Sequence, residues 1–414
     1  MKKRILLIGG NFYPEPTGIG KFNGEMVDFL ASQSYECTVI TSYPYYPYWK
    51  VQEPYCKRRN WYTKESKETT GTTPIEIYRC PQYVPKVPSG MKRILLDFSF
   101  CLSSFFVVLM LLFRKRYDAV ISVAPCFQVG LLAVLYKKIR GGKFVYHVQD
   151  LQIDAARDLQ MIKSPWMIDL LLKVEKFILR NADTVSSISL GMIKRIARKY
   201  KREIVFLPNW VDTRSFYPVK EKSKLKKAYG FDQEDKIVLY SGAIGEKQGL
   251  EAILYTAHAL RNHRSIKFVI SGSGPYKQKL EQLKDRMLLK NVVFLPLQPF
   301  ETLNEFLNMA DIHLVLQKAN VSDLVMPSKL TAILSVGGLA IVTAHKESSL
   351  FEFVSRHELG ILIEPENQSA LTSAISKVLI RNANAGDLNQ NARRYAEEYL
   401  SIEKIIPDYT LYIQ

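Results

Sequence analysis

One stretch of the chain combines glycines and a lysine in a way that suits phosphate chemistry. Ile237–Leu250 reads IVLYSGAIGEKQGL, an apolar run followed by a glycine turn, one lysine and the start of a helical pattern. A strand that turns on glycine into a helix leaves backbone N–H groups free at the positive end of that helix, where phosphate oxygens are stabilised. Lys247 adds a mobile cation. We predict that Gly242, Gly245 and Lys247 contact a phosphate, the alternative being a turn made only for packing.

Two other glycine turns could add N–H donors for the same ligand. The first, GGNFYPEPTGIG, follows an opening apolar strand and contains Gly18 and Gly20. It lacks the third glycine of the G-x-G-x-x-G dinucleotide fingerprint. The second follows the apolar run Ile266–Ile270 and contains Gly272 and Gly274 within SGSGP. We predict that both turns approach a phosphate or a sugar through backbone N–H groups.

A serine and a lysine stand at another predicted helix start. In the segment VMPSKL, Pro327 fits the first turn of a helix, and Ser328 and Lys329 follow it directly. This position suits a diphosphate, although a serine and a lysine at a helix start are also ordinary surface residues. We predict that Ser328 and Lys329 belong to the same phosphate site.

An imidazole and two carboxylates follow a further predicted strand. His147 lies near the end of the apolar run Lys143–Val148, and Asp150 and Asp154 follow within the next six residues. Ligands of parallel sheets bind beyond the carboxyl ends of the strands, so these groups are expected at a crevice. We predict that His147 and Asp150 act on the substrate, while a buried, hydrogen-bonded histidine is the alternative for His147.

The pattern of apolar runs predicts the strands, helices and domains that position these residues. The 414 residues are too many for one core. Short apolar strands alternate with helical patterns up to about residue 212, and the alternation restarts after the charged stretch Asp212–Asp235, which we take as a linker. Such alternation is typical of parallel sheets covered by helices on both faces. The fold class is therefore α/β with two doubly wound domains.

The net charge indicates which partners the protein binds, and the cysteines indicate its cellular compartment. The 57 Lys and Arg against 40 Asp and Glu give a net charge of +17, which favours nucleic acid, an anionic bilayer or anionic substrates as partners. The chain shows no groove-reading motif, so we expect no nucleic acid. The five cysteines are odd in number and widely spaced, which indicates a reducing, cytoplasmic compartment rather than disulfides or a zinc site.

The most apolar run suggests a membrane. Ile94–Phe113 is flanked by basic residues on both sides and is just long enough to span a bilayer, but Asp97 and several serines interrupt it. We expect a long helix, partly core and partly lying on the inner face of the plasma membrane over about 92–116. A wholly buried helix is the alternative. The aromatic and basic stretch Ser42–Tyr62 could bind sugars, lie at a membrane interface, or pack on itself.

Six segments in chain order resemble a known family. GGNFYPEPTGIGKFNGEM, HVQDLQIDAA, LPNWVD, LYSGAIGEKQGLE, SGSGP and VMPSKL are similar to bacterial family-four glycosyltransferases of GT-B fold, and within them to the colanic-acid and O-antigen fucosyl- or fucosamine-transferases. The resemblance implies two Rossmann-like domains facing a central cleft. It implies an acceptor-binding domain at 1–212, a nucleotide-sugar-binding domain at 213–394, and a last helix at about 395–414 that packs back on the first domain.

The resemblance also implies a reaction. A sugar of fucose or N-acetylfucosamine type would pass from a UDP- or GDP-linked donor to a lipid-linked saccharide with retention of configuration, without metal or other cofactor. Lys247 and Lys329 would stabilise the departing diphosphate, and Asn209 would join the donor-binding residues. His147 would lie beside the reacting sugar, with Asp150 orienting the acceptor or the histidine.

Two departures from the family pattern stand out. Ala243 occupies the place where the wider family has an arginine for the phosphates. The paired glutamates around VMPSKL are missing, and Asp323 is the one carboxylate that could replace the sugar-binding member. A GT-B fold sugar-nucleotide epimerase and a non-catalytic nucleotide- or membrane-binding homologue are therefore the alternative functions.

Overall fold

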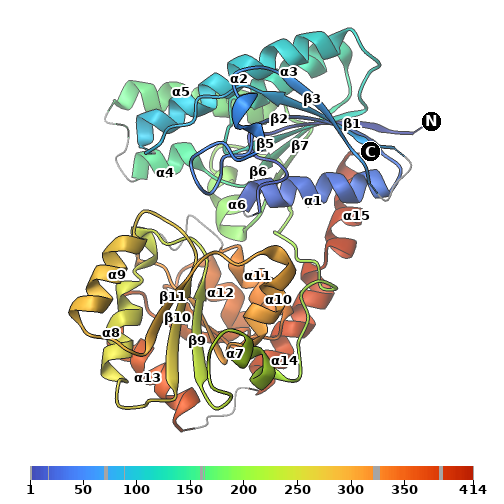
Figure 1. Cartoon of the computed structure of the whole chain (residues 1–414). Coiled ribbons are helices and arrows are strands. Elements are labelled where there is room, and N and C mark those ends of the chain that lie inside the picture. Colours follow the sequence, from blue (N-terminus) through green and yellow to red (C-terminus); the bar gives the residue numbers. More distant parts are fainter. Residues whose placement is uncertain are drawn as a thin grey trace. The chain divides into compact units, whose positions relative to one another are not determined.

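The computed structural model describes residues 2–16, 18–69, 73–87, 89–158, 162, 164–319, 327–381 and 386–413. The chain forms two compact units, each an α/β body with one main sheet (Figure 1). Unit 1 comprises Met1–Pro208 and Ile405–Gln414, and unit 2 comprises Asn209–Lys404. The chain therefore leaves unit 1 just before the charged stretch that the sequence marked as a linker, and returns to it within the last helix.

The sheet of unit 1 has the strand order β3-β4-β2-β1-β5-β6-β7-β8 over the described residues, and β3 alone runs antiparallel to its neighbour. Its elements in chain order are β1 (Arg4–Ile8), α1 (Gly18–Ser32), β2 (Glu36–Ser42), η1 (Tyr55–Lys57), β3 (Thr63–Lys67), β4 (Ile75–Cys80), α2 (Gly90–Leu112), β5 (Ala119–Ala124), α3 (Val129–Arg140), β6 (Lys143–Val148), α4 (Gln152–Asp158), α5 (Pro165–Asn181), β7 (Thr184–Ser187), α6 (Leu190–Ala197) and β8 (Ile204–Phe206).

The sheet of unit 2 has the order β11-β10-β9-β12-β13-β14 and is parallel throughout the described pairs. Its elements are α7 (Lys222–Ala228), β9 (Lys236–Ser241), η2 (Glu246–Gln248), α8 (Glu251–Ala259), β10 (Ile266–Ser271), α9 (Lys277–Arg286), β11 (Val292–Leu295), α10 (Phe300–Asn308), β12 (Ile312–Val315), α11 (Lys329–Ser335), β13 (Ala340–Thr343), α12 (Ser349–Arg356), β14 (Gly360–Ile363), α13 (Gln368–Leu379), α14 (Gly386–Tyr395), the π-helical turn Ala396–Leu400 and α15 (Ile402–Ile413).

Helices cover both faces of each sheet, as the alternating pattern predicts. In unit 1, α2 and α3 lie on one face and α1 on the other (Figure 1). In unit 2, α8, α9 and α13 pack into one apolar cluster, and α10, α11, α12 and α14 into a second cluster on the opposite face (Figure 1). The central strands of each sheet are apolar on both sides because both sides are buried.

The strand β3 carries no sequence signal of its own. Its residues, TKESK, are polar, and alternate side chains are exposed at the edge of the sheet. Pairing with β4 and ion pairs hold it in place: Lys64 Nζ lies 2.7 Å from Glu76, and Lys67 Nζ lies 2.6 Å from Asp28. A polar edge strand of this kind protects the sheet from pairing with other chains.

The C-terminal segment is broken where one helix was expected from about residue 395. The chain bends at Ser401, which forms a β-bridge with Val211 within unit 2. Only the part from Ile405 onward belongs to unit 1, where the hydroxyl of Tyr409 lies 3.2 Å from Ser186 Oγ.

Helix α2 offers two neighbouring phenylalanines for a direct test of its packing. Phe100 is 0% exposed in the core of unit 1, whereas Phe98 is 58% exposed. We expect Phe100→Ala to lower the free energy of unfolding of unit 1 by about 3–5 kcal/mol, because it removes a fully buried ring. Phe98→Ala should change it by no more than about 0.5 kcal/mol. Urea unfolding of both variants checks this, and equal losses would contradict the two-faced arrangement.

Candidate active site

The glycine turns after β9 and β10 are packed backbone against backbone. A Cβ atom added at Gly272 would lie 1.8 Å from the carbonyl oxygen of Gly242, and one at Gly274 would lie 2.1 Å from the carbonyl oxygen of Ile244. No side chain fits at either position. These glycines are therefore required for the close approach of the two turns, at the carboxyl ends of adjacent strands.

Three of the predicted phosphate-binding N–H groups are already used within the protein. The amide of Gly242 donates to Ser271 O at 2.9 Å, and that of Gly272 to Leu295 O at 3.3 Å. The amide of Gly245 donates to the side chain of Gln248 at 3.1 Å. A donor satisfied inside the turn is not free for a ligand in this structure, so these three N–H groups do not support the predicted phosphate contact. That Gly242, Gly245 and Gly272 lie at the phosphate site stays a prediction.

Lys329 supplies the charge that these amides do not. Its Nζ lies 3.5 Å from the centroid of the Tyr240 ring, and a Cβ atom on Gly242 would lie only 3.0 Å from it. The nitrogen is buried and has no hydrogen-bond acceptor within the described part of the chain. Burial lowers the pKa of Lys329 from 10.5 to about 7. The Tyr240 hydroxyl donates to Ala243 O at 2.6 Å, which fixes the ring.

A buried ammonium group with no acceptor among the described residues would be stabilised by an anion. Removing a charge from water is costly unless an opposite charge compensates it, and the cation–π contact with Tyr240 compensates only in part. An arriving diphosphate would restore both the charge and the hydrogen bonds of Lys329. The geometry therefore brings together four of the predicted residues, namely Gly242, Gly272, Gly274 and Lys329.

The other residues predicted to bind the donor lie in different surroundings. Lys247 is exposed on the short helix η2, whose chain is held by a hydrogen bond from Lys318 N to Lys247 O at 2.9 Å. Ser328 is exposed just before α11. Asn209 is buried as the first residue of unit 2. Asp323 lies outside the described residues.

His147 lies one residue before the end of β6, whose bounds are those that the sequence predicts, but its side chain points into the protein. The imidazole is 1% exposed inside unit 1. Its Nδ1 lies 2.9 Å from Ser186 Oγ, and its ring packs against Tyr409 with 6.3 Å between centroids. Burial lowers the pKa of His147 to about 3, so the ring is neutral. The structure thus corrects the prediction: His147 is the buried, hydrogen-bonded histidine that was the alternative.

The first glycine loop is built around a carboxyl group that sequence reasoning missed. Glu15 accepts hydrogen bonds from the amides of Tyr45 and Tyr46, at 3.1 and 3.0 Å, and from Asn11 Nδ2 at 2.9 Å. Burial raises the pKa of Glu15 to about 7. A Cβ atom on Gly20 would lie 2.5 Å from Glu15 Oε2, so Gly20 is needed for this contact.

Gly18 has a different role in the same loop. It is the first residue of α1 and has a φ of +64°, a conformation that L side chains rarely adopt. Gly18 therefore allows the chain to enter the helix, and it lies in unit 1 rather than among the turns of unit 2.

A second carboxyl group of unit 1 was predicted only as an interruption of an apolar run. Asp97 is buried on α2, and burial raises its pKa to about 7, with the nearby Asp150 adding to the rise. The amide of Gln152, oriented to satisfy its hydrogen bonds, donates to Asp97 Oδ2 at 2.9 Å and to Pro125 O at 3.0 Å. Asp150 is thus close enough to Asp97 to affect its pKa. Asp154 is also buried and pairs with Lys199 and Arg157.

No group of three or more His, Cys, Asp or Glu side chains that could hold a metal ion occurs among the residues that the structure describes.

Two α/β units, each with a largely parallel sheet covered by helices, fit the GT-B fold. Comparison with known proteins agrees with this fold. The family model of glycosyl transferases group 1 matches residues 221–397, and that of the glycosyl transferase 4-like domain matches residues 17–210. The chain is 39% identical over 411 residues to the colanic acid biosynthesis glycosyl transferase WcaI of Escherichia coli (strain K12), covering 97% of this chain and 98% of the relative. The chain therefore belongs to this glycosyltransferase family.

Solved structures show the same fold. Sucrose-phosphate synthase from Thermosynechococcus elongatus superposes with a TM-score of 0.75 at 18% identity, over 99% of this chain and 98% of its own. The Anabaena protein HepE in complex with UDP-glucose superposes with a TM-score of 0.69 at 13% identity, over 99% and 98%.

The buried lysine predicts a pH dependence of stability. Between pH 7 and about 10 the unfolded state keeps the Lys329 proton that the folded state has lost, so the free energy of unfolding should rise with pH there. We expect wild type to gain up to about 1.4 kcal/mol per pH unit over Lys329→Met, with parallel curves below pH 6. Denaturant titrations at several pH values check this, with Lys236→Met as the matched control. If the difference in the free energy of unfolding between wild type and Lys329→Met stayed constant across pH 7–10, burial would not have lowered the pKa of Lys329.

Proposed function

We propose that this chain is a retaining glycosyltransferase that moves a sugar from a nucleoside diphosphate-sugar to a lipid-linked saccharide during assembly of a bacterial surface polysaccharide, a capsule, an O-antigen or an exopolysaccharide. The observation that carries the proposal is the Lys329 ammonium group, buried against the turns of unit 2 with no hydrogen-bond acceptor among the residues that the structure describes. A diphosphate supplies the missing anion. Membership of the glycosyltransferase family supports the reaction class.

The chemistry needs positive charge where the diphosphate leaves. As the bond to the sugar breaks, negative charge grows on the phosphate oxygens, and preorganised cations in a dry site stabilise it strongly. We assign this role to Lys329, with exposed Lys247 as a second and mobile cation. Binding of the diphosphate should recharge Lys329 by proton uptake, because an anion favours the ammonium form. We propose that this charge replaces the metal ion that other sugar transferases use.

Relatives suggest the donor and the product, which we adopt as part of the proposal. The HepE structure, which shares the fold, holds UDP-glucose, so UDP-linked donors are tested beside GDP-linked ones. The name of the 39% identical relative concerns colanic acid biosynthesis, which supports a surface polysaccharide as the product. The motif resemblance favours a sugar of fucose or N-acetylfucosamine type. The five free cysteines support a cytoplasmic site for the reaction.

We assign the acceptor to unit 1. Asp150 follows the end of β6, and a carboxyl group there can accept a hydrogen bond from a sugar hydroxyl, while the buried Asp97 lies beside it on α2. Retention in this family implies that a phosphate oxygen of the leaving group takes the acceptor proton. The two carboxyl groups would then orient the acceptor, and His147 would support the strand from within.

Lys247 and Lys236 provide a matched pair for testing the phosphate site. Both are lysines at the ends of one strand, Lys236 starting β9 and Lys247 following its carboxyl end. With a panel of UDP- and GDP-sugars and a lipid extract as acceptor, Lys247→Ala should lower kcat/KM by about 100-fold. Lys236→Ala should stay within about twofold of wild type.

The same assay separates the alternatives. Conversion of a donor to its epimer without any acceptor would indicate an epimerase. Failure of both UDP and GDP to raise the thermal stability at millimolar concentration would contradict a nucleotide-sugar enzyme of either kind, since a ligand that binds the folded state must stabilise it.

A further inference from the structure

Helix α2 exposes an apolar stripe along its whole length. Every third or fourth side chain on its outer face is hydrophobic and at least 40% exposed, and the stripe consists of Leu95, Phe98, Leu102, Phe106, Met110 and, just beyond the helix, Phe113. At a rise of about 1.5 Å per residue the stripe runs for roughly 30 Å. Soluble monomers rarely expose a continuous apolar surface of this size, so we expect a binding partner or a membrane to cover the stripe.

The helix is long and apolar enough to cross a membrane by length and composition, but its other face is committed to the protein. Phe100, Val108 and Leu111 are each 0% exposed within the core cluster of unit 1. A helix that spans a bilayer would have to withdraw these side chains from the core. The arrangement instead fits a helix lying in the plane of a membrane interface, with one face in protein and the other in lipid.

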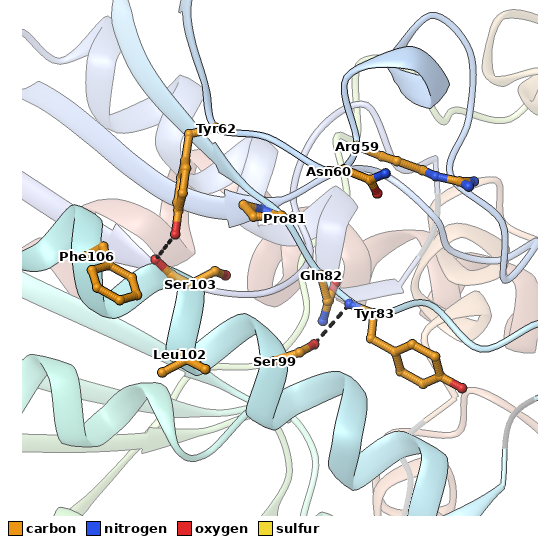
Figure 2. Close-up of a pocket in the computed structure, with 10 residues that line it drawn as sticks. All are labelled: Arg59, Asn60, Tyr62, Pro81, Gln82, Tyr83, Ser99, Leu102, Ser103 and Phe106. Carbon is orange, nitrogen blue, oxygen red and sulfur yellow. Dashed lines mark hydrogen bonds between the residues drawn. The ribbon is translucent and has the colours of Figure 1, made fainter.

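A hollow of about 460 Å³ adjoins the middle of the stripe (Figure 2). Two hydrogen bonds fix its walls to α2: the Tyr62 hydroxyl donates to Ser103 O at 3.1 Å, and the Tyr83 amide donates to Ser99 Oγ at 3.0 Å. Arg59 lies at its rim (Figure 2). The hollow thus combines aromatic walls with a cationic edge, which suits a phosphate-bearing headgroup.

Basic residues predominate around the stripe, and Glu76, which pairs with Arg114 at 4.0 Å, is an acidic exception. Asp97 is the only acidic residue of α2, and it is buried. Exposed basic residues flank the helix at both ends, and a third group, Lys57–Arg59, stands beside the hollow. Trp61, 74% exposed, adds an aromatic ring of the type that prefers the headgroup region of a bilayer. An anionic surface therefore complements this face in both charge and hydrophobicity.

We infer that the outer face of α2, together with residues 57–62, docks unit 1 on an anionic bilayer, and that the hollow beside Arg59 receives a lipid headgroup. A second copy of the chain is a poorer occupant, because a symmetric pairing would bring the same positive charges together. The inference concerns a surface of unit 1 and does not depend on the reaction proposed for the chain.

Vesicle binding by the full chain tests this docking surface. The purified protein should co-sediment with phosphatidylcholine vesicles that contain phosphatidylglycerol and much less with pure phosphatidylcholine, and added salt should weaken binding. The double variant Phe98→Glu, Phe106→Glu should lose about tenfold or more in binding. Leu411→Glu, at a side chain of unit 1 that is 67% exposed, is the matched control and should bind as wild type. Each of Arg58→Ala and Arg59→Ala should cost about fivefold.

Tryptophan fluorescence provides a second test of whether this surface contacts lipid. Brominated lipids should quench Trp61, so the quenching should disappear in Trp61→Phe and persist in Trp166→Phe, where the ring is 68% exposed elsewhere on unit 1. Circular dichroism and UDP binding without vesicles should be unchanged in the glutamate double variant, which separates docking from the proposed reaction.

Three results would overturn the inference. The first is equal binding of the folded wild type and the glutamate double variant to anionic vesicles, or no binding by either. The second is a wild-type dimer in light scattering that the double variant breaks while vesicle binding is absent. The third is resistance of cell-membrane-bound protein to carbonate extraction, which would show that the helix spans the bilayer.

Discussion

A single buried charge organises the second half of this protein. The Lys329 ammonium group lies over the face of Tyr240 and beside Gly242, with no hydrogen-bond acceptor in the described part of the chain. Its place depends on two turns that touch at their backbones, which only glycine permits. Because the surroundings exclude water, a diphosphate there interacts with the cation more strongly than it would on an exposed surface. Binding of the anion thus offsets the free energy that it costs to keep the ammonium group away from water.

Buried carboxyl groups have the corresponding role in unit 1. Glu15, in the first glycine loop, accepts hydrogen bonds from the amides of Tyr45 and Tyr46. Asp97 on α2 accepts a hydrogen bond from Gln152, which also donates to Pro125 O just after β5. Both groups have a pKa raised to about 7 by burial. The same helix that carries Asp97 inward presents Phe98 outward. In our account the surface proposed to meet the bilayer and the carboxyl group proposed to orient the acceptor are therefore adjacent on one rigid element.

Much of this arrangement could be predicted from the sequence because it depends on periodicity. Apolar runs separated by helical patterns predict the two sheets, and glycines after two of those runs predict the turns of unit 2. Lys329 was found from its position at a helix start, but its burial and its contact with Tyr240 come from a strand nearly ninety residues earlier in the chain. Such a contact has no local signature.

Other features were misjudged for equally physical reasons. His147 sits one residue before the end of β6, and its alternation directs the ring toward Tyr409, a residue from the far end of the chain. The amide groups of Gly242 and Gly245 were expected to be free, but Gly242 donates to Ser271 of the next strand and Gly245 to the side chain of Gln248 in its own turn. The edge strand β3 is polar because one side faces water, so hydrophobicity could not reveal it.

Direct titration of Lys329 tests the central claim. In protein labelled with ¹³C at lysine Cε, the Lys329 signal can be assigned by its absence from Lys329→Arg and followed by NMR across pH. The account predicts a pKa of about 7 in the free protein and a clear rise when UDP is added. A free-protein pKa near the ordinary lysine value of about 10.4, unchanged by UDP or GDP, would contradict it.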